Sequence, residues 1–150
     1  MTRQSALTPE FVELVPSEIK EGVIYISMIY GSAIHKCCCG CGRKVVTPFG
    51  PTDWKLIFDG ESVSLHPSIG SWNLSCQSHY WIKRNKVKWA PRWSQEMIES
   101  GRVHDRLAKW RYFEECTKTP PTGATVANAG RSKEYKSEES IWSKLKRWWS

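Results

Sequence analysis

Short apolar runs, separated by turns that contain glycine, proline or Asp-Gly, dominate residues 11–90 of this 150-residue chain. The strongest run, Val23–Tyr30, is β-branched and aromatic and predicts a buried strand. Asp59-Gly60 stands between two further runs and is a favoured hairpin turn. The remaining runs predict more short strands, at Ala33–Cys37, Arg43–Thr47, Trp54–Phe58, Ser62–Leu65, Tyr80–Arg84 and Val87–Trp89. Residues 1–10 lack such a pattern, and we expect them to be frayed.

The spacing of apolar residues changes after Arg92. From Trp93 to Trp110 they recur at helical intervals, which predicts one or two amphipathic helices with a break near Gly101. Residues 117–138 are rich in Pro, Gly, Ser and Thr and predict a flexible linker. In residues 139–150, Ile141, Leu145 and two tryptophans line one face of a predicted helix, and basic residues lie around that face. The predicted fold class is therefore α+β: a small, mostly antiparallel β domain with following helices (1–116), a linker, and a short C-terminal amphipathic helix.

The net charge of +7 favours acidic partners such as a protein surface, nucleic acid or anionic lipid. A basic stretch at 83–92, interleaved with tryptophans, is compatible with nucleic-acid binding, which we rank below two other hypotheses for the function. The C-terminal helix is suited to contact with a membrane surface or a partner's groove. The first residues lack the apolar core of a secretion signal, so we expect a cytoplasmic location.

A cluster of cysteine and histidine is the most informative feature of the sequence. Residues 35–42 read His-Lys-Cys-Cys-Cys-Gly-Cys-Gly, and a Cys-x-x-His pair follows at 76–79. Adjacent cysteines form disulfides with each other poorly, and a reducing compartment favours metal binding over disulfides. Thiolate and imidazole ligands in a tetrahedral set are typical of zinc. The sequence therefore predicts one Zn²⁺ ion held by residues from two distant segments.

Six side chains are candidates for about four ligand positions around the metal. Cys39, Cys41, Cys76 and His79 are our first choice of ligands. His35 and Cys37 are alternatives, as ligands, as partners of the ligands or as a proton carrier. A structural site would be closed by four protein ligands, whereas a catalytic site would leave one position for water. Spacing alone does not decide between the two.

Two polar residues near the cluster are candidates for catalysis. Glu21 precedes the strongest strand and could act as a general base at the metal, although a solvated turn residue is the simpler interpretation. Ser78 lies inside the Cys-x-x-His pair and could direct its hydroxyl into the site or merely support a turn. No Ser-His-Asp set, phosphate loop or dinucleotide fingerprint is recognisable.

Three segments of the predicted β part stand out as a set: FVELVPSEIKEGVIYIS, HKCCCGCGRKVVTPFGPTDWKL and VSLHPSIGSWNLSCQSHYWI. Together they resemble the bacterial family known as domain of unknown function 6527, over residues 11 to about 90. The resemblance implies zinc binding and an operon that encodes a ubiquitin-like protein with E1-like and E2-like enzymes. It also implies a peptidase role in removing that modifier from its conjugates. Carried over by position, it supports His35, Cys37, Cys39, Cys41, Cys76 and His79 as the metal-site set, and it makes Glu21, Ser68 and Ser78 worth testing.

Two functions follow as hypotheses. The first is a zinc-dependent peptidase that detaches a ubiquitin-like protein from its targets, with a metal-bound water as nucleophile and Glu21 as base. The second is a non-catalytic zinc module that docks onto E1-like or E2-like enzymes. A closed shell of four protein ligands would favour the second hypothesis, and an open position would favour the first.

Overall fold

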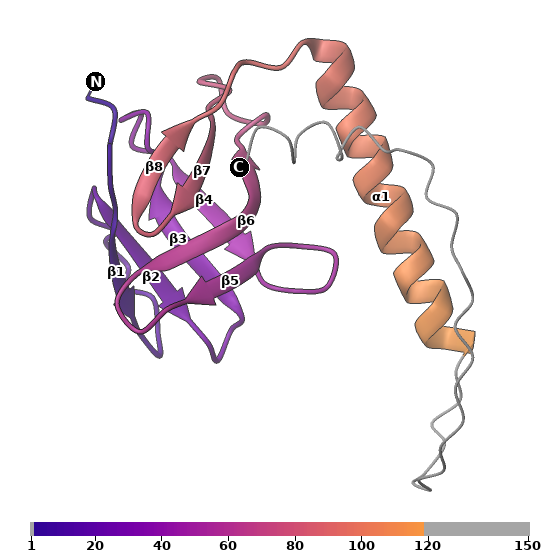
Figure 1. Ribbon diagram of the computed structural model, residues 1–150, viewed down its shortest axis with the longest axis horizontal. Coiled ribbons are helices and arrows are strands. Elements are labelled where there is room, and N and C mark those ends of the chain that lie inside the picture. The colour runs from indigo at the N-terminus through magenta and orange to yellow at the C-terminus, as the bar shows by residue number, and fades with distance from the viewer. Residues whose placement is uncertain (1, 119–150) are drawn as a thin grey trace, which may run out of the picture. The chain divides into compact units, whose positions relative to one another are not determined.

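The computed structural model describes residues 2–118, which form eight β-strands and one helix (Figure 1). One four-stranded sheet has the order β1-β2-β3-β4, with bounds Thr8–Phe11, Val23–Ser27, Ser32–Lys36 and Lys44–Pro48. The other has the order β5-β6-β7-β8, with bounds Lys55–Phe58, Val63–Gly70, His79–Lys83 and Lys86–Trp89. Strand β1 pairs with β2 in parallel, and the other neighbouring strands pair antiparallel. The predicted, mostly antiparallel β domain followed by a helix is confirmed.

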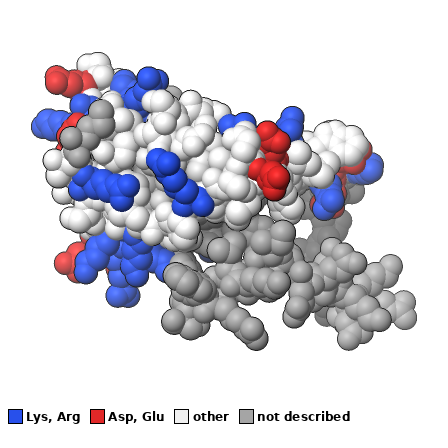
Figure 2. Space-filling model, turned by 90° about the horizontal axis from the view of Figure 1, so that it is seen from above, with Lys and Arg blue, Asp and Glu red and all other residues white. Residues whose placement is uncertain are grey.

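The core lies where the two sheets face each other (Figure 1). Each sheet contributes the inward half of its alternating side chains, as the period of two in a strand requires. On β4, for example, Val45 and Thr47 are buried while Lys44 and Val46 are exposed. The buried cluster combines residues from both sheets, including Ile24, Ile26, Ala33, Val63, Leu65, Ile69, Tyr80 and Ile82. Lys and Arg side chains are dispersed between uncharged ones on the face shown in Figure 2.

The N-terminal residues join the two sheets, so the prediction that residues 1–10 are frayed is wrong from Gln4 onwards, where the Gln4 amide donates to the Cys38 carbonyl. The Leu7 amide donates to the Asn85 carbonyl (2.7 Å), and the Val87 amide donates to the Ser5 carbonyl (2.8 Å). The chain then continues as β1 along β2. Leu7 is buried in the shared core. Tertiary pairing therefore orders a segment whose own sequence has little strand propensity.

A single helix, α1 (Gln95–Lys118), follows the β domain and runs through Gly101 without a break. Ser94 caps it, since its hydroxyl accepts a hydrogen bond from the Met97 amide at 3.3 Å. Ile98 is its one buried residue. The first residues of the predicted linker, 117 and 118, belong to α1, and the rest of the linker and the predicted helix 139–150 lie outside the described residues. Within the described part of the chain, α1 is too polar to serve as a membrane span.

Strand β6 is longer than predicted and is only partly covered by its neighbour. Strand β5 pairs with Val63–His66, so residues 67–70 have no strand on that side among the described residues. On the other side, the register with β7 shifts between Leu65 and Ile69. Such irregularities are common beside active sites, because they redirect a side chain. Ser68 lies in this irregular, uncovered stretch.

Candidate functional site

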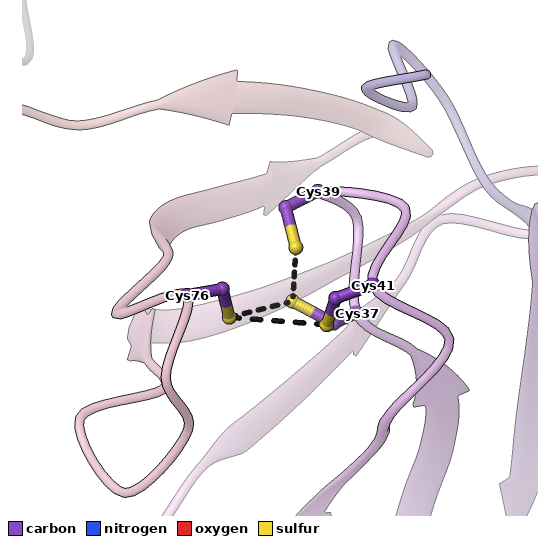
Figure 3. Close-up of side chains that lie close together, drawn as sticks. All are labelled: Cys37, Cys39, Cys41 and Cys76. Atoms are coloured by element: carbon purple, nitrogen blue, oxygen red, sulfur yellow. Dashed lines mark hydrogen bonds between the residues drawn. The ribbon is translucent and has the colours of Figure 1, made fainter. Parts of the chain in front are cut away.

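Four cysteine sulfurs converge between the two sheets (Figure 3). Three come from the β3–β4 loop and the fourth, Cys76, comes from the β6–β7 loop. The sulfur of Cys37 lies 3.5 Å from that of Cys39 and 3.8 Å from that of Cys76, and the sulfurs of Cys41 and Cys76 are 3.9 Å apart. All four sulfurs lie within 4.8 Å of one another. This set could hold one metal ion.

The backbone of the β3–β4 loop explains why its sulfurs converge. Gly40 and Gly42 have φ angles of 84° and 73°, in the left-handed region that glycine adopts at little cost. The Cys37 amide donates to the Arg43 carbonyl (2.7 Å), and the Gly40 amide donates back to the Cys37 carbonyl (3.1 Å). These hydrogen bonds close a tight loop in which the side chains of Cys37, Cys39 and Cys41 point towards one another. The glycines of the motif are thus required by the geometry of the loop.

The Ser78 hydroxyl lies against this sulfur cluster and hydrogen-bonds the sulfurs of Cys37 and Cys39. Burial raises the pKa of Cys37 to about 12. Burial also acts to raise the pKa of Cys39, but hydrogen bonds from Ser78, Cys41 and Cys37 outweigh it and lower that pKa to about 6. Ser78 is buried, so its contact with two sulfurs orients the end of the β6–β7 loop.

His35 lies outside the sulfur cluster. Its side chain is fully buried in the core, and its Nε2 atom is 2.9 Å from the Tyr80 hydroxyl. Burial lowers the pKa of His35 to about 4, so the ring is neutral at physiological pH. The same tyrosine hydroxyl also hydrogen-bonds Cys38, which is buried but is not one of the four clustered cysteines. His35, Tyr80 and Cys38 therefore form a polar link between the two sheets.

His79 also lies outside the sulfur cluster, and it pairs with Ser68. The His79 Nε2 atom is 2.9 Å from the Ser68 Oγ atom, and Nδ1 is 3.1 Å from the Pro91 carbonyl oxygen. A carbonyl oxygen only accepts hydrogen bonds, so Nδ1 carries the proton of the neutral ring. Nε2 is then free to accept the Ser68 hydroxyl proton. This is the arrangement of a serine activated by a histidine base, with a backbone carbonyl as the orienting group.

Three tryptophans surround the imidazole of His79. The ring centroids of Trp72 and Trp93 lie 5.0 Å from it, and that of Trp81 lies at 5.7 Å. Trp72 and Trp93 stack on each other at 5.3 Å. Burial lowers the pKa of His79, while its hydrogen bond to Pro91 acts in the opposite direction. The ring is therefore held in one orientation and in the neutral form that a general base requires.

Gly70 makes room for one of these tryptophans. It faces His79 in the β6–β7 register, and a Cβ atom at this position would overlap Cε2, Nε1 and Cζ2 of the Trp72 ring. The position thus requires glycine because the indole lies directly over the backbone of β6. Any larger residue must push Trp72 away from His79.

We expect Gly70→Ala to displace Trp72 and to lower the free energy of unfolding by about 1–3 kcal/mol, the usual cost of overpacking. Thermal unfolding and the chemical shifts of the His79 ring would measure both effects. The double variant Gly70→Ala/Trp72→Ala is the control. If the clash is the cause, Gly70→Ala should lower the free energy of unfolding much less in the Trp72→Ala protein than in the wild-type protein. Equal costs in both backgrounds would contradict this explanation.

The structure thus brings together four of the six predicted metal-site residues: Cys37, Cys39, Cys41 and Cys76. His35 and His79 have other partners, as described above. Glu21 is exposed in the turn before β2 and is not in the sulfur group. The Ser68–His79 pair was not found by spacing, because eleven positions separate the residues. The predicted strands 62–65 and 80–84 contain neither residue, and it is the pairing of β6 with β7 around the 71–78 loop that brings the two side chains to the same region.

The family model described as bacterial ubiquitination-like system serine protease (BubE) matches residues 11–90, which is more than half of the chain. No curated protein and no solved structure matches the chain. The match confirms the resemblance to a family of bacterial ubiquitination-like systems. Its description names a serine protease, whereas the resemblance implied a zinc peptidase. The matched segment contains Ser68, His79 and the four clustered cysteines. The chain belongs to the family of bacterial ubiquitination-like system serine proteases.

Proposed function

We propose that this protein is a serine peptidase that cleaves bonds at a ubiquitin-like modifier, with Ser68 as nucleophile and His79 as general base. The observation that carries the proposal is the 2.9 Å contact between Ser68 Oγ and His79 Nε2, together with the Pro91 carbonyl on Nδ1. The family description supports the serine chemistry and the pathway. The substrate follows from that pathway, in which a ubiquitin-like protein or its conjugates are the natural partners.

In the proposed reaction, Ser68 Oγ attacks the scissile carbonyl carbon while His79 Nε2 takes the hydroxyl proton. The Pro91 carbonyl keeps the Nδ1 proton in place and orients the imidazolium that forms. The tetrahedral intermediate collapses, and the leaving amine takes the proton from Nε2. Water then attacks the acyl-serine, with His79 again as base, which releases the acid and restores Ser68.

We propose that the four cysteines hold one zinc ion in a structural role. In a tetrahedral site with Zn–S bonds of 2.3 Å, the sulfurs lie about 3.8 Å apart. The sulfur separations of 3.5, 3.8 and 3.9 Å fit this arrangement. When bound, zinc would cross-link the β3–β4 and β6–β7 loops. Cys76 would then fix the loop that leads through Ser78 to His79.

Three features favour catalysis at Ser68 over catalysis at the metal. Four thiolates fill a tetrahedral shell and leave no position for water. Glu21 is exposed and outside the sulfur group, whereas His79 is already bonded to a hydroxyl. The closed shell would equally suit a non-catalytic docking module, the second hypothesis from the sequence. The Ser68–His79 pair favours the enzyme, because such a module would have no need of it.

The test uses the purified modifier of the same system in two forms: extended at its C-terminus by a reporter protein, and attached to a lysine of a target protein. We expect release of the modifier from at least one form, measured by mass spectrometry, and loss of release after treatment with a fluorophosphonate. Release that persists in fluorophosphonate-modified protein, but stops on removal of metal from protein that stays folded, would show metal-based hydrolysis instead.

A further inference from the structure

A groove of about 340 Å³ is lined in part by Ile69 and Gly70, the two residues that follow Ser68 on β6. One wall is the edge of β4, at Lys44–Val46, and the other is the end of β6 with the loop that follows it. Trp72, which contacts the His79 ring, belongs to this second wall. The groove therefore borders residues that lie next to Ser68 in the chain or contact the ring of His79.

The β4 wall offers unpaired main-chain groups. In an antiparallel pair, residues alternately bond to the partner strand and point away from it. The Cys37 amide donates to the Arg43 carbonyl, so the alternation directs the main-chain groups of Lys44 and Val46 away from β3. Pro48 fits this alternation, since its outward carbonyl accepts the Trp54 amide. In the described part of the chain, β4 ends its sheet, so the outward groups of Lys44 and Val46 form a free edge.

The opposite wall also has free main chain, because β5 stops pairing with β6 at His66. Ser68 lies in this uncovered part, and Ile69 and Gly70 line the groove. A chain lying between the two walls could pair with β4 on one side and with β6 on the other. Adding a strand to a free sheet edge is a common way to hold an extended peptide. Such a chain would run along the part of β6 that carries Ser68.

Two polar atoms on the groove residues have no hydrogen-bond partner among the described residues: Trp54 Nε1 and Ser71 Oγ. Both atoms are closed off from solvent, and the Ser71 side chain is more than nine-tenths buried. An unpaired buried polar group is costly, so each such atom in a folded protein calls for an explanation. A peptide main chain that displaces the groups covering these atoms would supply carbonyl acceptors for both donors.

The charged residues that line the groove, Lys44 and Arg102, are basic, and none of its described lining residues is acidic. Arg102 is held in place by its hydrogen bond to the Asn73 side chain at 2.8 Å. We infer that the groove between β4 and β6 binds the substrate as an extended peptide segment with acidic side chains. This inference rests on the proposed function, since it takes the groove to deliver that segment to Ser68.

The binding test uses Ser68→Ala protein, so that no probe is consumed. The probes are a fluorescein-labelled pool of short peptides in which Asp and Glu alternate with Thr and Val, and a matched pool with Lys and Arg. Fluorescence anisotropy should show tighter binding of the acidic pool. Lys44→Glu/Arg102→Glu should reverse this preference, by on the order of tenfold. Equal binding of the two pools, or a preference that the charge reversal leaves unchanged, would overturn the inference.

Two further variants test the main-chain and hydroxyl contacts. Val46→Pro removes an outward N–H, which an edge strand tolerates, whereas the control Val46→Thr keeps it. Ser71→Ala removes a hydroxyl that has no partner within the described protein, so it should not lower the melting temperature. Val46→Pro and Ser71→Ala should each weaken binding of the acidic pool about threefold to tenfold, and Val46→Thr should not. Unchanged binding in Ser71→Ala and in folded Val46→Pro would count against the groove.

A fluorophosphonate separates this inference from the proposed function. It is small and should label Ser68 of the wild-type protein without filling the groove. Labelling of Ser68 without binding of the acidic pool would reject the groove alone. Binding of the acidic pool without labelling would reject Ser68 as nucleophile and leave the groove as a binding site.

Discussion

Replacing Ser68 with alanine should lower kcat/KM for cleavage of the modifier by at least about a thousandfold. The reason is that, among the described residues, Ser68 carries the hydroxyl that contacts the Nε2 atom of His79, and alanine has no group to replace it as nucleophile. The loss should be confined to catalysis, because Ser68 is only partly buried and its bond to His79 is one weak contributor to stability. Steady-state cleavage assays, with thermal unfolding and metal content as checks, would measure it.

A serine elsewhere on β6 provides a matched control. Ser64 lies on the same strand, and its hydroxyl accepts a hydrogen bond from the Arg84 amide, so Ser64→Ala should retain activity. His79→Ala should be about as inactive as Ser68→Ala, and combining the two should add little, because the residues act as one unit. Near wild-type cleavage by folded Ser68→Ala protein would refute the assignment of the nucleophile.

Cys76→Ser should reduce the bound metal to well below one ion per chain and destabilise the β domain by several kcal/mol. Structural zinc sites contribute on the order of 10 kcal/mol of apparent binding energy, and that energy is coupled to folding. Cys76 is also the one cluster cysteine from the β6–β7 loop, so its loss should detach that loop from the β3–β4 loop. Elemental analysis and thermal unfolding would follow the two effects.

Cys116→Ser is the matched control, since Cys116 is exposed on α1, away from the cluster. It should keep both the metal and the melting temperature. Removal of the metal by a chelator should have the effects of Cys76→Ser, with activity and folded structure lost in parallel. A metal-free protein that stays folded but is inactive would point to a catalytic metal, and one that is folded and active would argue that the metal is dispensable.

Local sequence was sufficient for much of the architecture. Alternating and β-branched runs predicted most strands, and Asp59-Gly60 predicted the β5–β6 hairpin. The Cys-rich loop predicted its own convergence, because Gly40 and Gly42 permit the required backbone. Cys76 was included because it begins a Cys-x-x-His pair, whose residue types and spacing are suited to a metal ion. These features depend on residues near each other in the chain, or on donor chemistry alone.

Spacing was misleading for the histidines. A Cys-x-x-His pair can place both side chains on one ion, but β7 begins at His79 and the strand register turns its ring towards Ser68 and Pro91. His35 alternates with Cys37 along the chain, yet its ring enters the core and meets Tyr80. Residue type and spacing do not specify which face of a strand lies towards a partner sheet, since that depends on long-range pairing.

By itself, the sequence determined a small β domain, a following helix and a thiol cluster suited to a metal ion. Only the tertiary structure decided that four cysteines form the cluster and that Ser68 meets His79. The physical reason is the same in both cases. The contacts depend on the hydrogen-bond register between β6 and β7 and on the packing of one sheet on the other. The local sequence of each segment does not predict them.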